Sequence, residues 1–257
     1  MKRMLFGLIS CCALGAYAQM QMPHQPQPSD DPQSQPQLDL STEAMSHHHE
    51  DMGPHMKMST LREPQPGDQE RAAQIVKEAR SALEKYQDYH VAEKDDYKIF
   101  APNAPGKMKH FTNYSNAIEA AFTFDPKAPT SLLYQKTGDG GYKLIGAMYT
   151  APRGLTEDQL NKRVPLSVAQ WHQHVNLCLP PKGQRQEMFR KNAKFGLQGS
   201  ITTPEACDAA GGTFKPVVFG WMVHFYPWEK TQDEIWSVER QAPKHQMEDM
   251  KGMDMSH

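Results

Sequence analysis

The chain has 257 residues, with 28 Lys and Arg against 30 Asp and Glu, so its formal net charge at pH 7 is −2. This length is sufficient for one or two domains. A charge so close to zero argues against nucleic acid or an acidic membrane surface as a partner.

Residues 1–18 have the pattern of a secretory signal peptide. A basic start is followed by an apolar run over residues 4–15 and by a small-residue cleavage site ending at Ala18. The apolar run is too short for a membrane span. A lipoprotein signal ending at Cys11 is the less favoured alternative. With either signal, we expect a periplasmic or secreted mature protein.

Cleavage after Ala18 leaves two cysteines, Cys178 and Cys207. Two cysteines in an oxidising compartment predict one disulfide. The alternative is that Cys178 is a thiolate ligand of a metal ion.

Both ends of the mature chain are rich in histidine and methionine. Residues 19–66 contain many Gln, Pro, Ser and Asp residues without an apolar period, which predicts a disordered arm, and residues 237–257 form a second arm. Thioether and imidazole groups together suit copper, so both arms are candidates for low-affinity ion capture. A low-complexity segment without a role is the alternative. The candidate arm ligands are His47, His48, His49, Met52, His55, Met56 and Met58, and then His245, Met247, Met250, Met253, Met255 and His257.

Between the arms, residues 67–236 are predicted to form a single α+β domain with an antiparallel sheet and a few helices. A long first helix is expected over residues 68–89, with Asp68 as its N-cap, because apolar residues recur there at helical spacing.

Short strands and turns are expected in the rest of the domain. A glycine-rich connection at 137–141 predicts a hairpin. Thr203 and Pro204 have the pattern of a helix start. The period over residues 116–124 does not distinguish helix from strand. Strands are predicted over residues 97–100, 132–136, 142–149, 171–178 and 217–226.

Two of these strands have one apolar and one polar face. Alternation along residues 171–178 places Trp171, Val175 and Leu177 on one face. The other face carries His172, His174, Asn176 and Cys178, with its two imidazoles about 7 Å apart along the strand. The last strand has Phe219, Trp221, Val223 and Phe225 on one face and Met222, His224 and Tyr226 on the other.

If these strands are neighbours with a common core, their opposite faces bring His172, His174 and His224 together. Three imidazoles describe a zinc or copper site, and a thioether from Met222 would favour copper. His110 is a further candidate ligand from a loop. Asn176 and Tyr226 are candidates for orienting the imidazoles.

Other interpretations of the same residues remain open. One alternative is that the histidines are ordinary strand residues, exposed or hydrogen-bonded to a carbonyl group. The chain could also be a metalloenzyme with an open coordination position, or a module that binds a ligand or partner without a metal.

Several of these stretches resemble a family of secreted bacterial proteins that has no established activity. The resemblance rests on His110–Asn113, Leu144–Tyr149, Trp171–Pro181 and Gly220–His224, with the pattern W-H-x-H-x-N-x-C at its centre. It covers roughly residues 70–230 and implies no substrate or cofactor. The terminal Met/His tracts resemble those of periplasmic copper-resistance proteins in composition only.

Overall fold

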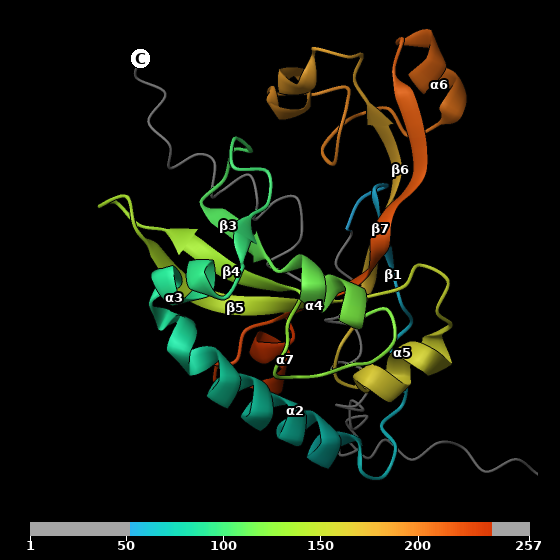
Figure 1. Cartoon of the computed structure of the whole chain (residues 1–257). Helices are drawn as coiled ribbons and strands as arrows, with labels where there is room; N and C mark the ends of the chain where they lie inside the picture. Colours follow the sequence, from blue (N-terminus) through green and yellow to red (C-terminus); the bar gives the residue numbers. More distant parts are fainter. Residues whose placement is uncertain (1–51, 238–257) are drawn as a thin grey trace, which may run out of the picture. The chain divides into compact units, whose positions relative to one another are not determined.

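A computed structural model of the chain describes residues 52–237 (Figure 1). These residues contain a seven-stranded antiparallel sheet with the order β1-β6-β7-β5-β4-β3-β2, together with several helices. The predicted single α+β domain is therefore confirmed. Within residues 52–237, no helix is long and apolar enough to cross a membrane. The predicted signal peptide, the first arm up to residue 51 and the second arm from residue 238 lie outside the described residues.

The elements follow one another along the chain with short connections. The strands are β1 (Met56–Met58), β2 (Lys98–Ile99), β3 (Met108–Thr112), β4 (Ser131–Lys136), β5 (Tyr142–Ala151), β6 (His172–Leu179) and β7 (Thr213–Phe225). The α-helices are α2 (Asp68–Leu83), α3 (Tyr89–Lys94), α4 (Tyr114–Glu119), α5 (Glu157–Arg163), α6 (Pro204–Ala209) and α7 (Gln232–Ile235), and two 3₁₀ helices are η1 (Glu84–Gln87) and η2 (Arg185–Phe189).

The main hydrophobic core lies between α2 and one face of the sheet. The buried residues of α2 are spaced as one helical face and share a core with aromatic side chains of β7 and with Trp171, which directly precedes β6. In Figure 1, α2 runs beside the sheet with α7 on the same side. Buried members of this core include Ile75, Ala79, Leu83, Trp171, Trp221, Val223 and Phe225.

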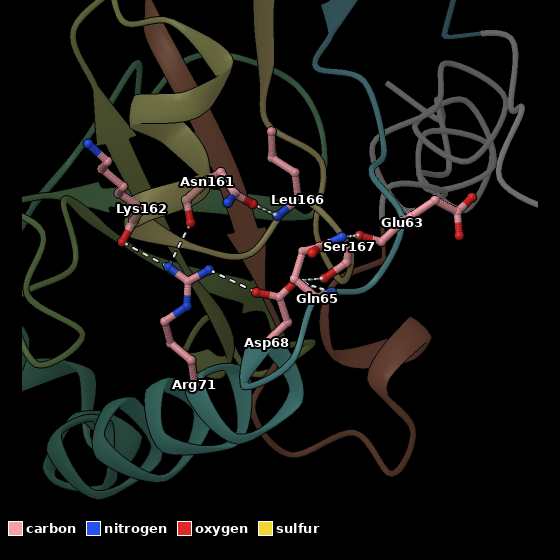
Figure 2. A network of polar contacts seen from close by, with 8 residues as sticks. All are labelled: Glu63, Gln65, Asp68, Arg71, Asn161, Lys162, Leu166 and Ser167. Atoms are coloured by element: carbon pink, nitrogen blue, oxygen red, sulfur yellow. Dashed lines mark hydrogen bonds and ion pairs between the residues drawn. The ribbon is translucent and has the colours of Figure 1, made fainter.

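The first turn of α2 is fixed by a buried carboxylate (Figure 2). Asp68 accepts hydrogen bonds from the Ser167 hydroxyl at 2.6 Å and from the backbone N–H of Gln65 at 3.1 Å. The hydrogen bond from Ser167 is the main reason that the pKa of Asp68 is lowered. The predicted N-cap was therefore wrong by one residue, because Gly67, with φ 88°, occupies that position and Asp68 is the first helical residue.

The predicted helix over residues 68–89 is shorter than expected. Regular α-helix ends at Leu83, and the 3₁₀ helix η1 follows. The backbone becomes extended at Asp88, whose side chain accepts from the N–H of His90 and so caps the separate helix α3.

The prediction of disorder up to residue 66 was wrong for the segment that contains β1. This strand pairs with β6 and forms one edge of the sheet. Directly after it, the N–H of Ser59 donates to the carbonyl of Trp171 at 2.7 Å, and the N–H of Trp171 donates to the Ser59 hydroxyl at 3.0 Å.

The C-terminal end of β6 and the N-terminal end of β7 project beyond the other strands toward α6 (Figure 1). Here the predicted disulfide between Cys178 and Cys207 is present. The two cysteines are fully buried and pack with Phe195 in a small separate cluster. Because both sulfur atoms are in the disulfide, Cys178 is not a thiolate metal ligand, and that alternative is excluded.

Candidate metal centre

The face of the sheet that points away from α2 carries the candidate site. In β7, Trp221 and Val223 belong to the main core, so the alternating residues Met222 and His224 lie on the opposite face. Strands β6 and β7 are antiparallel neighbours, and His172 is paired with Met222. The pairing places His172 on the same face.

Four imidazole rings lie next to one another on this face. The ring centroids are 5.4 Å apart for His172 and His174, and 5.3 Å apart for His172 and His224. His110 joins them, with its centroid 5.6 Å from that of His224. Its predicted position in a loop was wrong, because it is a residue of β3. Bond lengths of about 2 Å from imidazole nitrogen to zinc place the centroids of two rings on one tetrahedral ion about 5 Å apart.

The rings have this spacing but not the orientation of a completed metal site. Within residues 52–237, no group of three or more His, Cys, Asp or Glu side chains is arranged so that it could hold a metal ion as it stands. An ion bound here would therefore need these side chains in a different arrangement.

The approach of His110 to His224 shows that the sheet is strongly curved. Strands β3 and β7 are separated by β4 and β5, which corresponds to about 14 Å in a flat sheet with strands about 4.8 Å apart. Phe100, which follows β2, similarly contacts Phe219 of β7, with ring centroids 5.8 Å apart. The face that carries the imidazoles is therefore concave.

A bulge in β7 contributes to this shape. The register between β6 and β7 shifts between His172 and His174, and Phe219 has a φ of 68°. The expected alternation of apolar residues in β7 fails at this point: Phe219 is 52% exposed and does not join Trp221 in the core.

Buried nitrogen atoms without partners lie on this face, as they do in the main core, where the Nε1 atoms of Trp171 and Trp221 also have none. His172 and His224 are 1% and 6% exposed. The Nδ1 atoms of His172, His174 and His224 are buried and have no hydrogen-bond partner. Leaving such an atom unpaired costs about 1–3 kcal/mol, and three of them lie close together here.

The environment keeps these imidazoles neutral. Burial, followed by the proximity of other histidines, lowers the pKa of His172 and His224 well below the usual value. Burial likewise lowers the pKa of His110 and of His174 to about 4. The neutral imidazole is the form that binds metal ions. At pH 7, protons therefore compete little with a metal ion for the nitrogen atoms of the four histidines.

Several predicted site residues have other roles. His55, predicted as an arm ligand, is buried, and both of its ring nitrogens lie within hydrogen-bonding distance of backbone carbonyl groups. Nε2 is 2.6 Å from the carbonyl oxygen of Gly199, and Nδ1 is 3.3 Å from that of Val175. Asn176 donates to the carbonyl of Pro54 at 3.3 Å and orients no imidazole.

The other predicted ligands and partners fall into three groups. Tyr226 packs with Met222 and Met148 in the small cluster on the concave face. Met56 and Met58 are residues of β1, and Met52 is buried just before it. The remaining arm candidates lie outside the described residues.

Sequence reasoning missed one methionine of this face, Met148. It is paired with His224 across β5 and β7 and is 9% exposed. Its strand is predictable, but its position opposite a histidine depends on the pairing of two distant strands.

Two cavities of the described residues lie away from the histidines. An open groove of about 600 Å³ runs along α2 and α7, where Val76, Arg80 and Ile235 line it. The second, of about 20 Å³, lies beside α4. Neither is lined by a histidine.

Comparisons of the chain with protein-family models, with curated proteins and with solved structures found no match. The resemblance around the W-H-x-H-x-N-x-C pattern therefore stays a prediction.

Proposed function

We propose that this chain is a metal-binding protein that holds a copper or zinc ion on the concave face of its sheet. The ligands are drawn from His110, His172, His174 and His224. The observation that carries the proposal is the group of three buried Nδ1 atoms without partners, in rings spaced about as far apart as rings on one ion.

The composition of the chain ends supports the same function. His47, His48 and His49 precede the folded residues, and methionines alternate with charged residues after position 245. In this proposal the arms collect ions loosely outside the cytoplasm, and the buried histidines hold one ion more firmly. A disulfide is compatible with an oxidising compartment.

Binding to the folded residues can be separated from binding to the arms by thermal unfolding. An ion bound only by the native cluster raises the melting temperature, because it stabilises the folded state by mass action. An arm that binds the ion equally well in the folded and the unfolded chain does not change the melting temperature. We expect Zn(II) or copper to raise the melting temperature of the full chain.

The matched variants are His172→Gln/His224→Gln and His90→Gln. His90 lies on α3 and its side chain is 60% exposed, outside the concave face. The double variant should lose the metal-induced rise in melting temperature, whereas His90→Gln should keep it. Equal responses of the double variant and the wild type, or no response of the wild type to either metal, would refute the proposal.

A further inference from the structure

Methionines lie directly across from the three histidines of β6 and β7. His172 is paired with Met58 of β1 on one side and with Met222 of β7 on the other. Paired residues of antiparallel strands point to the same face, with Cβ atoms about 4.5–5.5 Å apart. The remaining two pairs are Met56 with His174 and Met148 with His224.

These methionines differ in depth. Met148 and Met222 are 9% and 5% exposed, and they pack together with Leu133 and Tyr226 at the bottom of the concave face. Met56 and Met58 are partly exposed on the edge strand β1. The face therefore has two thioethers at its floor and two at its rim.

The charge of this face favours an ion of low charge. The charged groups that affect the pKa values of His110, His172 and His224 are other histidines, with no carboxylate among them. The cost of burying an ion increases with the square of its charge, so neutral ligands compensate a monovalent ion more readily than a divalent one. Soft thioether ligands select Cu(I) among the common biological metals.

We propose that the concave face is a Cu(I) site in which Met148 and Met222 supply thioether ligands beside His172 and His224. Met56 and Met58, partly exposed on the edge strand, lie across from His174 and His172. This inference rests on the proposed metal-binding function and adds to it the oxidation state of the ion and a new ligand, Met148.

The test compares Met148→Leu/Met222→Leu with Met188→Leu in the full chain. Leucine keeps most of the methionine volume, so both variants should fold. Met188 packs beside the disulfide cluster and is the matched control. Melting temperatures are measured without air, with Cu(I) supplied by ascorbate reduction in the absence of thiols, and separately with Zn(II).

We expect Cu(I) to raise the melting temperature of the wild type and of Met188→Leu more than Zn(II) does. In Met148→Leu/Met222→Leu the rise with Cu(I) should fall by more than half, and that with Zn(II) should be unchanged. If the double variant keeps the full Cu(I) response, the thioether assignment is wrong, although histidine-based binding stands. If the wild type responds to neither ion, the metal-binding function itself fails.

Discussion

Gly146 is a residue at which the close approach of β5 to the end of β7 can be tested by a single methyl group. A Cβ atom at this position would lie 2.3 Å from the carbonyl oxygen of Phe225 and 2.9 Å from Cδ1 of Tyr226. Gly146→Ala should therefore destabilise the protein by about 1–3 kcal/mol, because backbone must move to relieve the overlap. Gly138→Ala is the control, since a Cβ there meets nothing within 4 Å. Urea unfolding of both variants measures the difference, and equal midpoints would contradict the close approach.

The buried histidines also make stability depend on pH. The pKa of His172 and His224 is lower in the folded than in the unfolded chain, so the unfolded chain binds more protons below about pH 6.5. The contribution of these histidines to the stability of the metal-free protein should be complete above that pH and should be lost as the pH falls below it. Each such histidine contributes a slope of about 1.4 kcal/mol per pH unit.

Urea titrations of the metal-free chain at intervals between pH 7.5 and pH 4.5 measure this slope. In His224→Gln the loss should be shallower than in the wild type, because one proton-binding group is removed. A steeper loss, or stability that does not change with pH in the wild type, would contradict the burial of neutral imidazoles.

At the scale of elements, a buried hydroxyl group adds to the backbone pairing that attaches β1 to β6. Ser59 is 1% exposed and accepts the N–H of Trp171, which is itself fully buried. Ser59→Ala leaves this N–H without its partner, at a cost of about 1–3 kcal/mol. Thr60→Ala changes an exposed neighbouring side chain and should alter stability by less than about 0.5 kcal/mol. Equal unfolding midpoints of the two variants would show that the hydroxyl does not hold the strand.

The same elements show what local sequence can and cannot predict. The hairpin at 137–141 and the helix start at Thr203 follow from residues that are close in the chain, and both are present. Strand β1 has only three residues among Pro, His and Met, and only its pairing with β6 defines it. The contact of His110 with His224 requires curvature across β4 and β5, which no local pattern encodes.

At the scale of the whole molecule, the disulfide lies where β6 and β7 project toward α6. The histidine cluster lies elsewhere on the same two strands. Cys178 and Cys207 are 29 residues apart, and closing a loop of this length contributes about 3–4 kcal/mol in the chain-entropy model. Cys178→Ser/Cys207→Ser should lower the free energy of unfolding by about that amount. The metal-induced rise in melting temperature should persist, and its loss would show that the two regions are coupled.

The position of β1 at the sheet edge affects where a shorter recombinant protein can begin. A fragment starting at residue 67, just before the long helix, would lack β1 and would leave β6 as an open edge with unpaired backbone groups. Open edges of this kind invite pairing between molecules. We expect that fragment to aggregate, whereas one starting at residue 52 should remain monodisperse in size-exclusion chromatography. The opposite result would mean that these first fifteen residues are dispensable for solubility.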